Sequence, residues 1–299
     1  MVSFENVSKF ILSDVSIHIP KGSAVGIIGA SGAGKTTFMK LACGLLEPDG
    51  GNVYTMGKNP VINRSQLGRK MSCFFTGIPV LNEFRSVRDN FKDLQIVYQI
   101  SDTEFEPIYS DLATRFGFDA YEYTPVKSLS LGQRRRAELG AVLLQRPELL
   151  LLDEPANGLD ENAKTIFRDI LQERVKEGMT LLITSHDMKD ISQMCDRIMV
   201  LNQGKMLFYG NKNTLMRKYA PMDIMIIQYE GAIPDLEDLP LSRFSFDRDM
   251  LSIVYNSNYI TSAEILDLLI KKISIREVNV KKPGLEEVIL EMERMKGDI

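Results

Sequence analysis

The chain has 299 residues, enough for one large domain and a smaller one. Its 44% hydrophobic and 25% charged residues are typical of a globular protein that can bury a full core. The 36 basic and 40 acidic side chains nearly cancel, so no overall charge points to nucleic acid. From residue 221 onward acidic side chains outnumber basic ones 15 to 9, which argues against docking of this part onto nucleic acid or anionic lipid.

The cysteines and the apolar runs indicate the compartment. Cys43, Cys73 and Cys195 are isolated, with no CxxC spacing and no metal pattern, as in reduced cytosolic proteins. No stretch reaches the ~20 apolar residues that span a bilayer, and the first residues lack a signal-peptide layout. We therefore expect any membrane role to depend on a separate subunit.

The first 50 residues predict a β-rich start and then a buried strand, a glycine-rich turn and a helix. Residues 2–4 and 15–19 alternate as β-strands do and indicate a β-rich N-terminal part. Residues 25–28 form a short buried strand that runs directly into the glycine-rich turn. The helix is predicted over residues 36–46.

Farther along, strands and helices alternate. Residues 80–128 are polar and favour helices, and they lead into a predicted helix at 131–144. The predicted elements that follow are a strand at 149–152, a helix at 163–176, a strand at 181–184 and a helix at 188–195. This alternation predicts an α/β fold with a mostly parallel sheet.

The pattern changes near residue 221 and indicates a small α+β domain. The predicted elements there are strands near 223–229, 243–247, 251–255 and 274–280, and helices at 261–272 and from Leu285. The sequence shows no internal repeat.

Residues 29–36 fit the phosphate-loop pattern G-x-x-x-x-G-K-[ST] in full. Its glycines allow backbone N–H groups to form an anion nest, and the following helix aims its positive end at the same place. A chance match in a glycine-rich turn is the alternative, but the strand before and the helix after supply the required context. The predicted nucleotide contacts in this loop are Gly29, Ala30, Ser31, Gly32, Ala33, Gly34, Lys35, Thr36 and Thr37.

Two carboxylates follow the leucine run of residues 149–152. Asp153 is placed to hold Mg²⁺ together with the hydroxyl of Thr36, and Glu154 is placed to polarise an attacking water. An Asp-Glu pair that opens a surface turn is the alternative, but the buried strand before it and the phosphate loop upstream favour catalysis.

Residues 129–133, Leu-Ser-Leu-Gly-Gln, resemble the LSGGQ signature of ABC ATPases, and we call them the signature segment. The order of phosphate loop, signature, Asp-Glu pair and late histidine is similar to that family over residues 1–215. The resemblance implies that Ser130, Gly132 and Gln133 contact ATP bound to a second subunit.

The same resemblance assigns three further residues. His186 corresponds to the switch histidine that contacts the γ-phosphate, although a lone histidine after an apolar strand is often structural. Asp160 belongs to a segment similar to the D-loop, which lines the dimer seam. Phe10 stands where the family places the aromatic that stacks on adenine, and the alternative is an ordinary core aromatic. Lys35, Glu154 and His186 are thus the expected catalytic set.

One family position departs from the pattern. ABC ATPases carry a glutamine after the strand that precedes the helical subdomain, whereas here Thr76 or Gly77 stands in that place. A threonine hydroxyl has a shorter reach than a glutamine amide. We therefore expect slower or more loosely coupled hydrolysis rather than an inactive site.

The arginines 134–136 open the signature helix, where cations oppose the helix dipole. They either face phosphate or an acidic partner, or form a solvated surface.

The tail favours export over other uses of the ATPase. Residues 282–290, Lys-Pro-Gly-Leu-Glu-Glu-Val-Ile-Leu, are similar to the segment that closes many ATPase subunits of type 2 ABC exporters. The alternatives are an importer ATPase, or a non-transport ATPase that acts on a soluble or nucleic-acid partner. A translation factor would carry two such domains, and a chromosome ATPase would carry long coiled coils.

Together these features predict a P-loop ABC-ATPase core over residues 1–215, with a helical subdomain near 75–148, and a small α+β domain over 222–299. We expect a dimer, a homodimer by preference, that encloses two ATP–Mg²⁺ and drives a polytopic membrane permease. The protein would then be cytoplasmic and peripheral on the inner face of the membrane, with no nucleic-acid partner.

Overall fold

The computed structural model describes residues 1–219, 222–230, 236, 241, 243–282, 284–285 and 288–289. It divides into two compact units, Met1–Tyr209 and Gly210–Ile299. Within the described residues, no helix combines the length and apolar character that crossing a membrane requires.

A small antiparallel sheet opens the N-terminal unit. Its strands β1 (Val2–Lys9), β2 (Leu12–Ile19) and β4 (Gly50–Thr55) are arranged in the order β2-β1-β4. Alternate side chains of β1 and β2 are buried, which is the pattern of a sheet with one face on the core.

A six-stranded sheet forms the centre of this unit, in the order β5-β6-β7-β3-β8-β9. The pairs β5–β6, β6–β7, β7–β3 and β3–β8 are parallel. All residues of β3, β6 and β7 are buried, because helices or the small sheet cover both faces. The strands are β3 (Ala24–Ile28), β5 (Met71–Phe75), β6 (Leu149–Asp153), β7 (Thr180–Thr184), β8 (Arg197–Asn202) and β9 (Lys205–Asn211).

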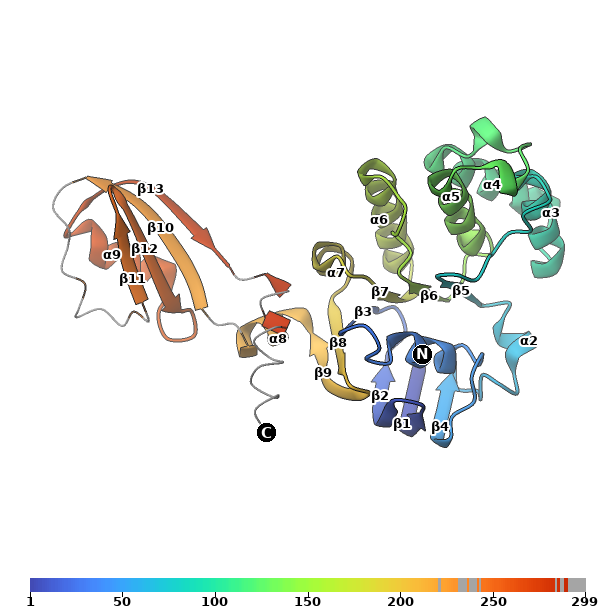
Figure 1. Cartoon of the computed structure of the whole chain (residues 1–299), viewed down its shortest axis with the longest axis horizontal. Helices are drawn as coiled ribbons and strands as arrows, with labels where there is room; N and C mark the ends of the chain where they lie inside the picture. The colour runs from blue at the N-terminus through green and yellow to red at the C-terminus, as the bar shows by residue number, and fades with distance from the viewer. Residues whose placement is uncertain are drawn as a thin grey trace. The chain divides into compact units, whose positions relative to one another are not determined.

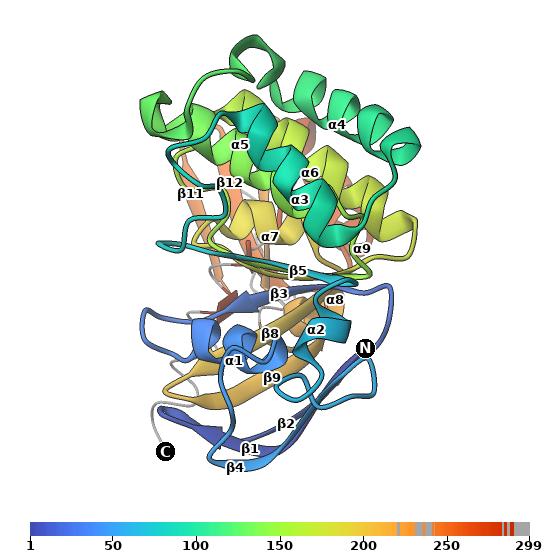
Figure 2. The same ribbon diagram turned by 90° about the vertical axis from the view of Figure 1, so that its right-hand side faces the viewer.

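Helices cover one face of this sheet, and one helix lies between the two sheets (Figures 1 and 2). Helix α1 (Lys35–Ala42) packs between β4 and β6, and Phe38 of α1 stacks on Phe4 of β1 at 4.3 Å. On the other face lie α3 (Val87–Tyr98), α4 (Asp102–Phe116), α5 (Leu131–Leu143), α6 (Glu161–Lys176) and α7 (Met188–Met194). Short turns complete the unit: α2 (Arg64–Leu67), η1 (Asp119–Tyr121) and η2 (Val126–Ser128).

Helices α3, α4 and α5 form the helical part between β5 and β6. Serines cap all three: Ser86 precedes α3, and Ser101 and Ser130 form capping boxes before α4 and α5. A cluster of aromatic rings, including Phe91, Tyr109 and Phe118, fills the space between them.

The C-terminal unit is an antiparallel sheet with a helix on one face. The strands β10 (Met222–Glu230), β11 (Arg243–Asp247), β12 (Met250–Asn256) and β13 (Ser274–Lys281) pair in the order β11-β12-β10-β13. Helix α9 (Ser262–Ile270) covers the sheet, and α8 (Lys212–Tyr219) precedes β10. Its core includes Ile227, Ile253, Tyr255 and Leu269.

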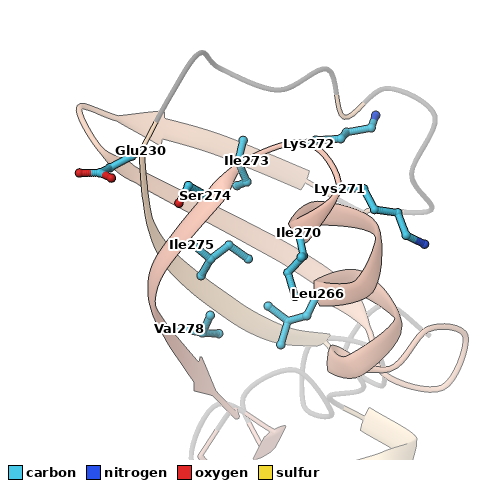
Figure 3. A pocket seen from close by; sticks show the side chains of 9 residues that line it. All are labelled: Glu230, Leu266, Ile270, Lys271, Lys272, Ile273, Ser274, Ile275 and Val278. Carbon is cyan, nitrogen blue, oxygen red and sulfur yellow. The ribbon is translucent and has the colours of Figure 1, made fainter.

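An open hollow lies between α9 and β13 (Figure 3). Leu266, Ile270 and Ile275 face the hollow, whereas Lys271 and Lys272 extend away from it. The lining therefore combines apolar side chains with the polar residues Glu230, Ser274, Lys271 and Lys272.

The predicted α/β fold with a mostly parallel sheet is confirmed. The predicted helix 36–46 was too long: α1 ends at Ala42, because Gly44 adopts a φ of +73° and lies against the backbone of Pro60. A Cβ at Gly44 would stand 2.3 Å from the Pro60 carbonyl oxygen, so only glycine fits there. Residues 283, 286, 287 and 290 of the tail segment 282–290 lie outside the described residues, and so does most of the predicted last helix from Leu285.

Candidate nucleotide site

The phosphate loop connects β3 to α1. Gly29 must be glycine, because a Cβ there would stand 2.1 Å from the Leu201 carbonyl oxygen. Gly34 has a φ of +105° and is the N-cap of α1, so no side chain caps the first N–H groups of this helix. Uncapped N–H groups at a helix start are suited to bind an anion such as phosphate.

The other predicted residues of the loop surround this helix start. Ala30, Ser31 and Gly32 are exposed at the tip, Ala33 is buried, and Thr36 and Thr37 are half-buried in the first turn.

Lys35 is folded back onto the loop. Its Nζ donates hydrogen bonds to the carbonyl oxygens of Gly29, at 2.7 Å, and Ala30, at 3.0 Å. Burial lowers the pKa of Lys35, and the nearby carboxylates of Glu154 and Asp153 oppose this shift. Lys35 is therefore held at the loop by two neutral carbonyl oxygens, which a phosphate can replace as acceptors.

Asp153 joins three neighbouring elements of the fold. The Thr36 hydroxyl of α1 donates to Asp153 Oδ2 at 2.7 Å, and the Thr184 hydroxyl of β7 donates to Oδ1 at 2.7 Å. These contacts follow from the sheet order, since β6, β7 and β3 are neighbours whose carboxyl ends meet at one edge.

The Thr36 hydroxyl and the Asp153 carboxylate are hard oxygen donors of the kind that Mg²⁺ prefers. No group of three or more His, Cys, Asp or Glu side chains gathers to hold a metal within the described residues. A two-donor site fits Mg²⁺, which commonly takes one or two protein ligands and completes its shell with phosphate and water.

Glu154 has an unusual backbone and a protected side chain. Its φ is +53°, a left-handed conformation that few residues other than glycine adopt. Its Oε2 accepts a hydrogen bond from the His186 main-chain N–H at 3.2 Å, and its Oε1 lies 3.3 Å from His186 Nε2. That second contact lacks hydrogen-bond geometry, so Oε1 is buried without a donor among the described residues.

Burial raises the pKa of Glu154, while His186 and Lys35 act in the opposite direction. A half-buried carboxylate with one unbonded oxygen can accept a hydrogen bond from a water molecule. The structure thus brings together Lys35, Thr36, Asp153, Glu154 and His186.

Thr76 lies next to the same aspartate. It follows β5, where Phe75 pairs with Asp153, and its hydroxyl donates to the Asp153 main-chain oxygen at 2.9 Å. The residue in the glutamine position is therefore directed at the backbone of β6.

Phe10 lies in the turn between β1 and β2 and is 73% exposed, so it is not a core aromatic. The neighbouring Leu12 packs against Gly34 of the phosphate loop, which places this turn beside the loop. The Lys9 ammonium lies 5.0 Å from the Phe10 ring centroid. An exposed ring in this place can stack on a nucleobase.

The signature segment lies at the start of α5. Ser130 Oγ accepts from the Gln133 N–H at 3.3 Å, and Gln133 Oε1 accepts from the Ser130 N–H at 2.9 Å. Gly132 lies so near Gly158 that a Cβ would stand 3.3 Å from the Gly158 oxygen. Among the described residues, no hydrogen bond or ion pair joins Ser130, Gly132 or Gln133 to the phosphate loop of the same chain.

Asp160 caps α6 through a bond from the Ala163 N–H at 2.8 Å and pairs with Arg136. Arg135 donates to the Asn157 oxygen at 3.1 Å and lies over the Phe74 ring. Each of the three arginines lies beside a carboxylate of the same chain: Arg134 and Arg135 contact Glu138, and Arg136 pairs with Asp160. The contacts of Arg135 and Arg136 also link the signature helix to residues 157–160.

Sequence reasoning missed Thr184 and the direction of Thr76. The sequence does show a threonine at the end of each of the two strands that neighbour β6. These threonines can be assigned to Asp153 only when it is known that β5 and β7 flank β6 in the sheet.

Comparisons with known proteins agree with this geometry. The sequence profile described as "ABC transporter" matches residues 12–157. The ABC transporter ATP-binding protein NatA of Bacillus subtilis is 30% identical over 226 residues, which cover 75% of this chain and 92% of the relative.

A second relative spans nearly the whole chain. The Nod factor export ATP-binding protein I of Rhizobium etli is 27% identical over 302 residues, covering 97% of this chain and 92% of the relative. A solved ATP-binding subunit of an ABC transporter superposes with a TM-score of 0.69 at 23% identity, covering 73% of this chain and 92% of that one. At that identity the superposition shows a shared fold.

Proposed function

The chain belongs to the family of ABC transporter ATP-binding proteins, and we propose that it drives export through a separate membrane permease. It is the ATP-binding subunit of an ABC transporter and an ATPase. The finer assignments below are its direction of transport, its partners and the roles of its residues.

The arrangement of Glu154, His186 and Lys35 carries the proposal for hydrolysis. Glu154 accepts a hydrogen bond from the attacking water at its unbonded Oε1 and orients that water for in-line attack. His186 holds the other oxygen of Glu154 through its main-chain N–H. Lys35 exchanges its carbonyl acceptors for the β- and γ-phosphate oxygens and balances their charge.

Thr36 and Asp153 would hold Mg²⁺, which neutralises charge on the phosphate oxygens when bound. The phosphate-loop N–H groups bind the phosphates, and Phe10 stacks on the adenine.

The signature segment supports a dimer. Ser130 and Leu131 are exposed at the start of α5, and the segment has no bond to its own phosphate loop among the described residues. We assign Ser130, Gly132 and Gln133 to the γ-phosphate of ATP on a second copy of the chain, with Asp160 at the seam. Closing and reopening of this sandwich would drive the permease.

Export is favoured over import by the relative that spans both units, whose name is that of an export ATPase. The tail segment 282–290 points in the same direction. We place the protein at the inner face of the cell membrane, held there by its permease.

The test compares wild type with Glu154→Gln in cells that carry the neighbouring genes, measuring ATP turnover and the proteins that co-purify. We expect turnover by wild type only, together with a polytopic membrane protein. Normal turnover with a soluble or nucleic-acid-bound partner would refute the transport role and leave the ATPase intact. Equal turnover by both proteins would refute the role of Glu154.

A further inference from the structure

Thr184 touches both carboxylate residues of the site. It is the last residue of β7 and is fully buried. Its hydroxyl donates to Asp153 Oδ1 at 2.7 Å and accepts a hydrogen bond from the Glu154 N–H at 2.9 Å. The Thr184 hydroxyl therefore bonds to two consecutive residues: its hydrogen is donated to the Asp153 side chain, and its oxygen accepts from the Glu154 main chain.

The bond to the Glu154 N–H fixes an unfavourable backbone. Glu154 has a φ of +53°, a conformation that persists in a residue other than glycine when its surroundings hold it. Of the described side chains, only Thr184 bonds to this N–H. The bond orients the peptide that aims the Glu154 carboxylate toward His186.

The bond to Asp153 has a second consequence. Both oxygens of Asp153 accept from threonine hydroxyls, Thr36 on one side and Thr184 on the other. If Thr36 coordinated Mg²⁺, its hydroxyl oxygen would turn toward the metal and its hydrogen bond to Asp153 would be lost. Thr184 bonds to the other oxygen of Asp153 from β7, so it would keep that bond when Thr36 changes partner.

We propose that Thr184 is a positioning residue for hydrolysis, which sets the direction of the Asp153 carboxylate toward the metal and of Glu154 toward the attacking water. This inference rests on the proposed roles of Asp153 and Glu154. A hydroxyl is required and a methyl is not, so serine can replace threonine but the isosteric valine cannot.

The chain provides a matched control on the same strand. Thr180 begins β7, is also fully buried, and its hydroxyl accepts a hydrogen bond from the Gly22 N–H at 2.9 Å. Thr180→Val removes one buried hydroxyl from the opposite end of the strand, away from both carboxylates.

The experiment uses the full chain with Thr184→Val, Thr184→Ser, Thr184→Ala and Thr180→Val, each checked by thermal melting. We expect Thr184→Val and Thr184→Ala to lower kcat by about tenfold or more, which corresponds to one lost interaction in the transition state. Thr184→Ser and Thr180→Val should stay within about twofold of wild type. If Thr184→Val does not fold, Thr184→Ala takes its place in the comparison.

A second readout does not depend on turnover. The affinity of a fluorescent non-hydrolysable ATP analogue is measured with Mg²⁺ and with EDTA. We expect Thr184→Val to reduce the gain in affinity due to Mg²⁺ by about tenfold, the size of effect that loss of an outer-shell partner has on a metal site. Its affinity in EDTA should match wild type.

The proposal is overturned if Thr184→Val matches Thr180→Val in kcat and in the Mg²⁺ gain, or if Thr184→Ser is as impaired as Thr184→Val. The Glu154→Gln variant distinguishes failure of the role of Thr184 from failure of the proposed function. An inactive Glu154→Gln beside a fully active Thr184→Val refutes the role of Thr184 alone. A Glu154→Gln as active as wild type refutes the proposed function, and the role of Thr184 with it.

Discussion

The N-terminal unit buries polar and charged side chains at one edge of its parallel sheet, whereas the C-terminal unit encloses a core that is almost wholly apolar. Lys35, Asp153 and Thr184 are all buried and bonded at the carboxyl ends of β3, β6 and β7. Of the buried polar side chains among the described residues, only Asp223 belongs to the C-terminal unit.

This difference has a physical origin. Burial of polar groups costs free energy unless they are paired, so a fold keeps them where they are satisfied or where they serve a reaction. The hollow between α9 and β13 is lined by apolar side chains together with Glu230, Ser274, Lys271 and Lys272, and both lysines extend away from it (Figure 3). We therefore assign the chemistry of the chain to Met1–Tyr209, and substitutions in both units test this assignment.

The largest effect is expected for Lys35→Ala. The variant loses the cation that would face the β- and γ-phosphates, and we expect turnover to fall about a thousandfold, about 4 kcal/mol. The measurement is steady-state ATP hydrolysis. Lys40→Ala is the matched control, since Lys40 lies on the same helix at its other end. Comparable losses in both variants would show an effect of helix stability and not of phosphate binding.

Ile253→Ala tests whether the C-terminal core is separate from the chemistry. Ile253 is fully buried in β12, and its truncation should lower the free energy of unfolding of this unit by about 3 kcal/mol. ATP turnover should change by less than about twofold. The measurements are urea unfolding and ATP hydrolysis.

Leu182→Ala is the counterpart in the N-terminal unit, because Leu182 is equally buried in β7. It should cost similar stability and lower turnover as well. If Ile253→Ala lowered turnover as strongly as Leu182→Ala, the two units would depend on each other and the comparison would fail.

The comparison also explains which parts of the fold could be predicted. The runs at residues 149–152 and 181–184 predicted β6 and β7 to within one residue at each end, because strands buried on both faces are continuously apolar. Helix α1 was predicted four residues too long, since Leu45 and Leu46 continue its apolar pattern. The helix ends at a tertiary contact, between Gly44 and Pro60, which local sequence does not reveal.

The sequence indicates which residues belong to the candidate site, but it does not predict the hydrogen bonds between them. Motif order selected Lys35, Asp153 and Glu154, because each chemical role requires a particular residue type. The hydroxyls of Thr184 and Thr76 reach Asp153 only because β7 and β5 flank β6. The order of strands in a sheet differs from their order in the chain, so the sequence left these contacts open.

Phe10→Ala is expected to have a moderate effect on ATP affinity. The ring is exposed beside the phosphate loop, and the loss of stacking on adenine should weaken binding by about 2 kcal/mol, about thirtyfold. Phe10→Tyr keeps the ring and should keep the affinity. The measurement is equilibrium binding of a fluorescent ATP analogue. Equal affinity of Phe10→Ala and wild type would assign the exposed ring to a different contact.

Thr76→Gln should have the smallest effect on turnover of these substitutions, and it tests a residue that bonds directly to Asp153. The Thr76 hydroxyl is bonded to the Asp153 main-chain oxygen, whereas a glutamine amide is longer and can reach beyond the backbone of β6. If the short threonine limits turnover, the glutamine should raise kcat about fivefold, about 1 kcal/mol, the usual net value of one hydrogen bond.

Thr76→Val is the control for this substitution, because it removes the hydroxyl and keeps the shape, and it should not raise kcat. Both variants are measured with and without the proposed membrane subunit. A rise confined to the complex would place the effect in coupling to the permease, and a rise in both would place it in the chemical step. Unchanged turnover of Thr76→Gln under both conditions would show that threonine serves the site as well as glutamine does.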